Sequence, residues 1–264
     1  MKVGFIGAGN MGYAMLKGAI KVFDDTIVYT DVNHDRLEYV KNSLGIDYVK
    51  TNQEVVDKSD IIVLAIKPQY MAQVLMELAI DAPKILISIA PGITIEHVNA
   101  LIGGNPKIVR AMPNTPALVG EGMSAISFGD MDFTENDKKE VVKLFESFGE
   151  SVVLAENLMD VVVPVSGSSP AYVYMFIEAM ADAGVLHGLS RDLAYKMAAQ
   201  SVLGAAKMVI ETGEHPGVLK DAVCSPGGTT IEAVRVLEKN GFRSSVIEAM
   251  DACYEKSQKF KNKN

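Results

Sequence analysis

The sequence contains no tryptophan, only two cysteines, and few aromatic residues, which make up 7% of its 264 residues. Cys224 and Cys253 have no regular spacing to a histidine or to each other. They therefore indicate neither a disulfide framework nor a zinc site. The four histidines also stand without paired ligands or acids, and we expect no bound metal.

Positive charge is scarce as well. Lysine and arginine total 25 against 33 aspartates and glutamates, which gives a formal net charge of −8 at pH 7. No basic stripe offsets this excess, so nucleic acid is excluded as the expected partner. Long apolar runs are also missing, because Val3–Ile6 is followed at once by glycines. This pattern indicates neither a signal peptide nor a membrane span, and we expect a cytoplasmic protein without a membrane partner.

A glycine-rich turn follows the first apolar run. Val3–Ile6 predicts a buried strand, and Gly-x-Gly-x-x-Gly then opens the amphipathic stretch Tyr13–Val22. In the dinucleotide-binding fingerprint the first glycine permits a tight turn, the second lets the backbone approach a pyrophosphate, and the third lets helix and strand pack closely. The residues expected to bind a dinucleotide here are Gly7, Gly9, Asn10, Met11 and Gly12.

Asp31 ends the second expected strand, Thr26–Thr30. It has two open interpretations: it binds the ribose 2′-OH of the dinucleotide, or it caps the helix that follows. A carboxylate at this position favours NADH, whereas Asn33, His34 and Arg36 could hold the 2′-phosphate of NADPH. We therefore expect NADPH or NADH as the cofactor.

Strand and helix patterns alternate in the first half of the chain. The expected strands are Lys2–Ile6, Thr26–Thr30, Ile61–Ile66, Lys84–Ile89, Lys107–Ala111, Ser124–Ser127 and Ser151–Leu154. The expected helices between them include Asn33–Leu44, Tyr70–Leu78, Ile95–Ile102 and Glu135–Phe148. This alternation predicts an α/β fold with a Rossmann-like, doubly wound and largely parallel sheet.

The pattern becomes almost entirely helical after Asn157. The expected helices are Pro170–His187, Ser190–Glu211, Thr229–Lys239 and Arg243–Lys259. Small residues recur at helical spacing between Ala194 and Ala206, which permits close helix packing. A half that is this apolar often packs against a second copy of the chain. We therefore expect an all-α C-terminal dimerisation domain.

The segment Ser225-Pro226-Gly227-Gly228-Thr229-Thr230 runs directly into an expected helix. Such a helix start presents unpaired backbone N–H groups, hydroxyls and the positive end of the helix dipole. Together these groups form a socket for a small anion such as a carboxylate. The residues expected to bind this anion are Gly227, Gly228 and Thr229.

These motifs resemble those of the pyrroline-5-carboxylate reductase family over essentially the whole chain. The family's segments correspond to Gly7–Gly12, Ala65-Ile66-Lys67-Pro68-Gln69, Ser88-Ile89-Ala90-Pro91-Gly92-Ile93, Arg110-Ala111-Met112-Pro113-Asn114-Thr115-Pro116, Pro170-Ala171-Tyr172, Leu203-Gly204-Ala205-Ala206 and Ser225–Thr230. One departure is Ser169, which stands where the family usually has glycine. Serine before proline can cap the next helix.

The resemblance implies reduction of the cyclic imine 1-pyrroline-5-carboxylate to L-proline, the last step of proline biosynthesis. It implies that Thr230 hydrogen-bonds the ring nitrogen, that Ser225 helps to hold the carboxylate, and that Met112 and Asn114 border the nicotinamide and substrate. It further implies cofactor contacts at Asn52, Ala65, Lys67, Pro68 and Ala90. The implied domains are residues 1–156, which bind the dinucleotide, and residues 157–264, which bind substrate and form a homodimer or higher homo-oligomer.

Simpler interpretations stay open for several residues. Asn52 could be only a helix N-cap, Lys67 could present its backbone, and Arg110 could be a cofactor-side cation or a surface charge. An alternative function is that of a β-hydroxyacid dehydrogenase, but its catalytic lysine has no counterpart in Pro170–His187. A non-catalytic dinucleotide-binding regulatory protein is a second alternative, against which the intact Ser225–Thr230 segment argues.

Overall fold

The structure is a computed structural model that describes residues 1–23, 27–80 and 83–261. The chain packs as two compact units. The first comprises Met1–Ser168 together with the chain from Cys253 onward, and the second comprises Ser169–Ala252. None of the helices within the described residues is both long enough and apolar enough to cross a lipid bilayer.

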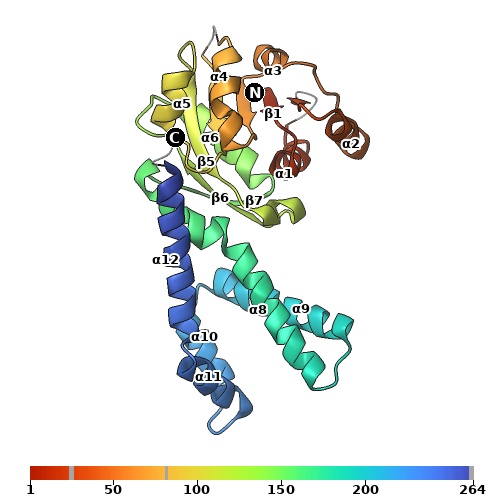
Figure 1. Cartoon of the computed structure of the whole chain (residues 1–264), viewed down its shortest axis with the longest axis vertical. Helices are drawn as coiled ribbons and strands as arrows, with labels where there is room; N and C mark the ends of the chain where they lie inside the picture. The colour runs from red at the N-terminus through yellow and green to blue at the C-terminus, as the bar shows by residue number, and fades with distance from the viewer. Residues whose placement is uncertain (24–26, 81–82, 262–264) are drawn as a thin grey trace. The chain divides into compact units, whose positions relative to one another are not determined.

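A seven-stranded sheet forms the centre of the first unit (Figure 1). Its strands are β1 Val3–Ile6, β2 Ile27–Thr30, β3 Ile61–Leu64, β4 Ile85–Ser88, β5 Lys107–Met112, β6 Gly122–Ser127 and β7 Gly149–Val153. The strand order is β2-β1-β3-β4-β5-β6-β7, in which β1 to β5 are parallel, β6 is antiparallel to β5, and β7 is parallel to β6. The expected doubly wound, largely parallel sheet is confirmed.

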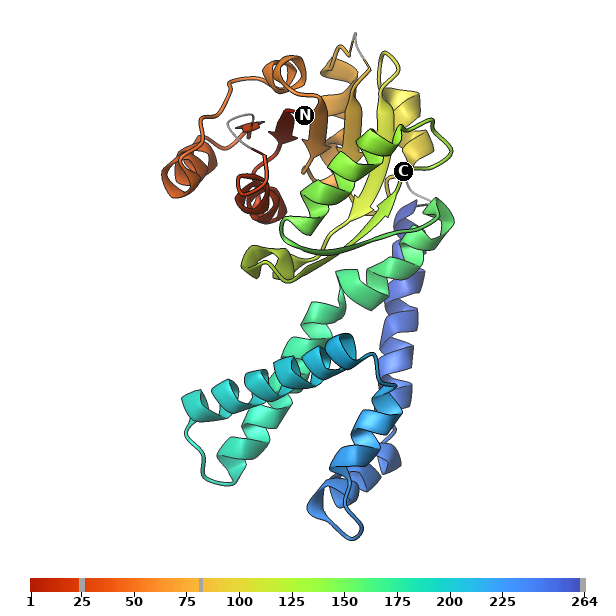
Figure 2. The same ribbon diagram turned by 180° about the vertical axis from the view of Figure 1, so that it is seen from behind.

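Helices cover both faces of this sheet, because the strands are apolar on both sides. The helices α1 Asn10–Ala19, α2 His34–Leu44 and α6 Glu135–Glu146 pack with Phe5 and Val63 in one hydrophobic layer. The helices α3 Asn52–Lys58, α4 Met71–Glu77 and α5 Ile95–Leu101 pack with Ile6 and Leu64 in the other. Figure 1 shows α4 and α5 in front of the sheet, and Figure 2 shows α6 over the opposite face.

Several element boundaries differ from those expected. The first helix begins at Asn10 instead of Tyr13, since Gly9 is already its N-cap. A short 3₁₀ turn, Pro68–Tyr70, precedes α4 and shortens that helix. The last strand, β7, begins at Gly149 instead of Ser151, and Gly149 pairs with Gly122. The two backbones lie so close together that a β-carbon at Gly149 would overlap the Gly122 backbone. Thr26, the expected start of the second strand, lies outside the described residues.

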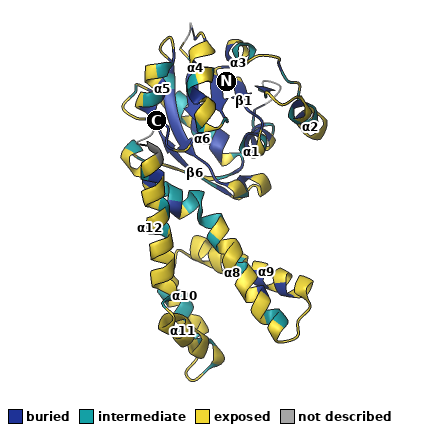
Figure 3. Ribbon diagram, viewed as in Figure 1, coloured by how far each residue is buried: buried dark blue, intermediate teal, exposed yellow. Residues whose placement is uncertain are grey.

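The second unit is entirely helical, as expected, and has little core of its own. Its helices are α8 Ser169–Leu186, α9 Arg191–Thr212, α10 Pro216–Val223, α11 Thr229–Lys239 and most of α12 Phe242–Lys261. All of residues 169–252 are described, and their buried hydrophobic residues are Ala181, Ala194 and Ala198. Met175 and Ile210 are 68% and 79% exposed. Figure 3 shows this exposure along α8, α9 and α11.

Candidate functional site

The glycine-rich turn between β1 and α1 has a separate reason for each of its glycines. Gly7 has φ +97°, and a β-carbon there would lie 2.5 Å from the carbonyl oxygen of Ala65. A β-carbon at Gly12 would overlap the carbonyl oxygen of Gly7. Nothing lies within 4 Å of the β-carbon position at Gly9, so this side of the turn is open. Asn10 and Met11 form the first helical turn beside it, where no described side chain caps α1.

The carboxylate of Asp31 is bonded to this turn. Its Oδ2 atom accepts a hydrogen bond from the N–H of Ala8 at 2.7 Å, and its Oδ1 atom accepts one from the N–H of Asn33 at 2.9 Å. The N-cap of α2 is Asn33, whose side chain accepts from the N–H of Arg36. The interpretation of Asp31 as the helix cap is therefore wrong, and its carboxylate instead joins the end of β2 to the glycine-rich turn.

Asp31 and Asn52 line the same cavity, which has a volume of about 360 Å³. Asn52 is the first residue of α3, but the N-cap of that helix is Thr51, whose hydroxyl accepts from the N–H of Glu54 at 3.2 Å. A capping role therefore does not explain Asn52. The side chain of Asn52 is therefore not used as a helix cap, and it lines the cavity next to Asp31.

Arg36 is hydrogen-bonded to the glycine-rich turn. Its Nε atom donates to the carbonyl of Ala8 at 2.5 Å and its guanidinium to the carbonyl of Gly9 at 3.3 Å. The guanidinium carbon lies 5.1 Å from the ring centre of Tyr13 and 4.9 Å from that of Tyr39. Both distances are in the range of cation–π contacts. The spacing of Arg36 and Tyr39 on α2 was the available sequence signal.

The other expected cofactor residues follow the carboxyl ends of β3 and β4. Ala65 donates its N–H to the carbonyl of Ile6 at 2.8 Å, which places it next to the end of β1. Lys67 is exposed, with extended backbone, and Pro68 begins the 3₁₀ turn. Ala90 is buried just beyond β4. Since β1 to β5 are parallel, these residues share one edge of the sheet with Asp31 and the glycine-rich turn, where open α/β sheets bind ligands.

Arg110 is not a surface charge. Its side chain is 2% exposed in β5, where the guanidinium pairs with Asp160 at 2.8 Å and lies 3.5 Å from a carboxylate oxygen of Glu156. Its Nε atom has no hydrogen-bond partner among the described residues. The Nε2 atom of Gln258, near the end of α12, donates to Asp160 at 3.2 Å. Asp160 is 50 residues from Arg110, and no sequence pattern marked it as a partner.

Met112 and Asn114 lie at and just beyond the carboxyl end of β5, and both are largely buried. The side chain of Met112 packs with Ala125 and Met159. The side-chain amide of Asn114 donates to the carbonyl of Ser166 at 2.9 Å and accepts from the N–H of Met123 at 2.8 Å. Both ends of this amide are therefore bonded to the protein's own backbone.

The Ser225–Thr230 segment lies in the second unit, where it forms the turn after α10 and the first two residues of α11. Gly227 has φ +68°, and Gly228 is the N-cap of α11, with no described side chain bonded at that cap. The first N–H groups of a helix have no intrahelical partner. Thr229 and Thr230 occupy the first two helical positions, so their N–H groups have no intrahelical partner, and anion binding there stays a prediction.

The only acidic side chain in the first turn of α11 is Glu232. Arg235 donates hydrogen bonds to this carboxylate, the shortest of them 2.5 Å long. These bonds hold the pKa of the Glu232 carboxyl below its usual value. Glu232 therefore stays ionised and is a poor proton donor. Within the described residues, no group of three or more His, Cys, Asp or Glu side chains is arranged to hold a metal ion.

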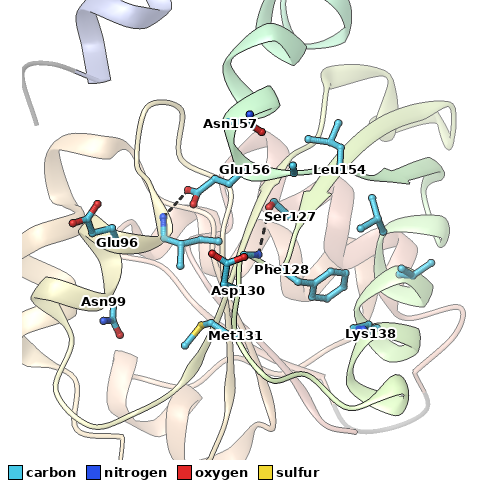
Figure 4. Close-up of a pocket in the computed structure, with 15 residues that line it drawn as sticks. Glu96, Asn99, Ser127, Phe128, Asp130, Met131, Lys138, Leu154, Glu156 and Asn157 are labelled. Carbon is cyan, nitrogen blue, oxygen red and sulfur yellow. Dashed lines mark hydrogen bonds between the residues drawn. The ribbon is translucent and has the colours of Figure 1, made fainter.

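Another cavity, with a volume of about 900 Å³, lies elsewhere in the first unit. It is bounded by residues 127–131 after β6, residues 153–157 at the end of β7, and parts of α5 and α6. Figure 4 shows Glu156 at this cavity, with the hydrogen bond that it accepts from the N–H of Ile95 at 2.8 Å. Its described lining includes none of the expected site residues, because β6 and β7 run opposite to β1–β5 and end at the other edge.

Comparisons with known proteins match two parts of this chain to two family models. A family model described as "Pyrroline-5-carboxylate reductase dimerisation" matches residues 156–260, and one described as "NADP oxidoreductase coenzyme F420-dependent" matches residues 2–92. A pyrroline-5-carboxylate reductase of Escherichia coli (strain K12) is 53% identical over 264 residues, covering 98% of this chain and 97% of the relative.

Solved structures are similar over the same length. A pyrroline-5-carboxylate reductase from Coxiella burnetii is 30% identical with a TM-score of 0.89, and 98% of each chain is covered. A pyrroline carboxylate reductase from Plasmodium falciparum, solved with NADP bound, is 35% identical with a TM-score of 0.84, covering 99% of this chain and 98% of that one.

Proposed function

The chain belongs to the pyrroline-5-carboxylate reductase family, and we propose that it reduces the C=N bond of 1-pyrroline-5-carboxylate to give L-proline. It is an NAD(P)H-dependent oxidoreductase of proline biosynthesis. The observation that carries the proposal is the presence of two separate sockets in one chain. One is the glycine-rich turn, open at Gly9, and the other is the uncapped start of α11 at Gly228.

The residues at the first socket fit a dinucleotide. The open side of Gly9 and the N-terminus of α1 would receive the pyrophosphate, with Gly7, Asn10, Met11 and Gly12 shaping the turn. Asp31 and Asn52 would hold the adenosine ribose, since they share a cavity beside that turn. Ala65, Lys67, Pro68 and Ala90 would border the cofactor along the same sheet edge. When bound, NADPH or NADH supplies a hydride to the imine carbon.

Two side chains at the turn act in opposite directions on the choice of cofactor. The carboxylate of Asp31 accepts from Ala8 and favours a ribose 2′-OH over a 2′-phosphate. The guanidinium of Arg36, held against Tyr13 and Tyr39, brings a positive charge to the same place. We propose that both NADPH and NADH are accepted, because the negative charge of Asp31 and the positive charge of Arg36 lie at the same turn.

The second socket fits the substrate carboxylate. The N–H groups of Thr229 and Thr230 and the backbone at Gly227 and Gly228 would bind it, assisted by the Ser225 hydroxyl. The Thr230 hydroxyl would hydrogen-bond the ring nitrogen. A cyclic imine is basic enough to be partly protonated near neutral pH, so the protein needs to hold the ring and needs no strong acid. The ionised state of Glu232 is consistent with that requirement.

The second unit is a dimerisation domain of a homo-oligomer. Association with another copy would account for the small number of hydrophobic residues that are buried within this unit. We propose that a second copy covers the exposed apolar residues of α8 and α9, giving at least a homodimer. In that arrangement the helical half of one chain would serve the cofactor domain of its partner. We assign residues 1–156 to dinucleotide binding and residues 157–264 to substrate binding and dimerisation, although residues 157–168 pack with the first unit.

We also propose that the reaction takes place in the cytoplasm. Cys224 and Cys253 are both free thiols, as is usual in a reducing compartment. A periplasmic or secreted location would contradict this assignment, and cell fractionation followed by immunodetection would reveal it.

Initial rates of NADPH and NADH absorbance loss with 1-pyrroline-5-carboxylate test the proposed reaction. We expect saturable, substrate-dependent oxidation of the cofactor and formation of L-proline. A β-hydroxyacid dehydrogenase would instead reduce NAD(P)⁺ with 3-hydroxy acids, but that chemistry needs a basic residue on the first long helix. The sequence of α8 contains no lysine, arginine or histidine. Activity with 3-hydroxy acids alone, or cofactor binding without turnover, would refute the proposal.

A further inference from the structure

The side-chain amide of Asn114 makes hydrogen bonds to two backbone groups that lack a regular backbone partner. Its side-chain oxygen accepts from the N–H of Met123, and its side-chain nitrogen donates to the carbonyl of Ser166. The residue is 8% exposed, so both bonds lie in an environment where an unpaired polar group is costly. Each bond has its own structural cause.

The first cause is that the ladder between β5 and β6 ends before Asn114, because a 3₁₀ turn, Thr115–Val119, begins at the next residue. The last pair of that ladder is Met112 with Ala125, so Asn114 would stand opposite Met123 if pairing continued. The main-chain carbonyl of Asn114 is already used by the N–H of Ala117, at 3.2 Å. The side-chain oxygen of Asn114 therefore takes the place of that carbonyl and satisfies Met123.

The second cause is Pro170, at the start of α8. A helical carbonyl bonds to the N–H four residues later, and for Ser166 that residue is Pro170, which has none. The chain passes here through a π turn, Val163–Gly167, in which the N–H of Ser168 donates to the carbonyl of Val163 at 2.8 Å. The carbonyl of Ser166 is left without its helical donor, and the Asn114 amide supplies one.

These two bonds join the end of β5 to the point where the chain leaves the first unit, between Ser168 and Ser169. Met112 lies beside the same turn, because its Cγ atom is 4.0 Å from the β-carbon position at Gly167. One amide thus fixes the strand end expected to border the nicotinamide and the turn that leads into α8.

We propose that Asn114 is a positioning residue for hydride transfer, which acts by fixing the Ser166 turn to the end of β5 instead of by binding the substrate. This inference rests on the proposed reduction of the imine. Loss of the bond would let the turn and the strand end move independently. The substrate and the nicotinamide would still bind, but in a less reactive alignment, for which a misplacement of about 1 Å costs up to about a hundredfold in rate.

The test compares Asn114→Ala with the double variant Asn114→Ala/Pro170→Ala in the full-length protein. Alanine at position 170 has an N–H, so it gives the carbonyl of Ser166 its own helical donor. We expect Asn114→Ala to lower kcat by about tenfold with little change in KM or in the Kd for NADPH. The isotope effect on kcat with 4-deuterated NADPH should rise, because hydride transfer becomes slower than the other steps. The double variant should recover at least half of the lost activity on a logarithmic scale.

Ile108→Val is the matched control, since Ile108 is fully buried in the same strand and its truncation lowers stability without touching the turn. It should lower Tm but leave kcat and the isotope effect unchanged. Three results would overturn the proposal: a raised KM as the main effect of Asn114→Ala, an unchanged isotope effect, or no recovery in the double variant. Failure of the wild-type protein to reduce the imine at all would instead reject the proposed function.

Discussion

Ser225 and Gly228 close the turn before α11: the N–H of Gly228 donates to the carbonyl of Ser225 at 3.0 Å, and the Ser225 hydroxyl fills the space that a β-carbon at Gly228 would need. Gly228 has φ −79°, a conformation open to any residue. A larger residue at position 228 would therefore have to displace the neighbouring hydroxyl, whereas the backbone angle would not oppose it. This separates it from Gly227, which has φ +68°.

Replacing Gly228 with a larger residue should therefore damage substrate binding specifically. In Gly228→Val the side chain displaces the Ser225 hydroxyl and blocks close approach of the substrate carboxylate. We expect the variant to bind NADPH and NADH normally but to lose saturation with 1-pyrroline-5-carboxylate. Cofactor fluorescence titration and initial rates measure the two properties separately, and normal substrate affinity would contradict the anion socket.

The hydroxyl of Thr230 provides a second test of the same socket. Thr230 lies at the second position of α11 and the N-cap is Gly228, so its hydroxyl is not required as a helix cap. If it orients the imine nitrogen, Thr230→Ala should lower kcat/KM by about ten- to a hundredfold. Thr230→Ser keeps the hydroxyl and should retain much of the activity. A kcat/KM for Thr230→Ala equal to that of the wild type would show that the substrate lies elsewhere.

Asp31 should determine how strongly the protein distinguishes the two cofactors. In Asp31→Ser the negative charge at the proposed ribose site is lost. We expect the ratio of kcat/KM with NADPH to that with NADH to increase, because a 2′-phosphate is no longer repelled. Steady-state kinetics with both cofactors give this ratio. If it does not change, Asp31 serves only to hold the turn.

The buried pair of Arg110 and Asp160 should contribute mainly to stability. Arg110→Met removes the guanidinium from the Asp160 carboxylate, which is 5% exposed and keeps its hydrogen bond from Gln258. Breaking such a pair on one side costs about 3–5 kcal/mol, which urea unfolding would measure. The double variant Arg110→Met/Asp160→Leu removes both charges and should be more stable than the single variant. A single variant that lost less than about 1 kcal/mol would show that the pair is not buried in solution.

Local sequence patterns predicted those parts of the site whose geometry depends on residues that are close together in the chain. Gly7, Gly9 and Gly12 act within one turn, and Gly228 and Thr229 act at one helix start, so their spacing was sufficient to predict their geometry. Arg110 could not be placed, because its burial depends on Asp160, which a different element brings to it. Likewise the two bonds of Asn114 depend on Ser166 and Met123, which meet only after the sheet and the π turn have formed.

The few small residues buried in the second unit have a consequence for how the protein is made. Because only three alanines are buried among the hydrophobic residues of its helices, we expect that a newly synthesised chain does not complete its second unit until it meets another copy. Folding of that unit and association are then a single second-order event, and its midpoint of thermal unfolding rises with protein concentration. A mutation on the exposed side of α8 or α9 would accordingly reduce the amount of protein in the cell before it altered any rate constant of the enzyme.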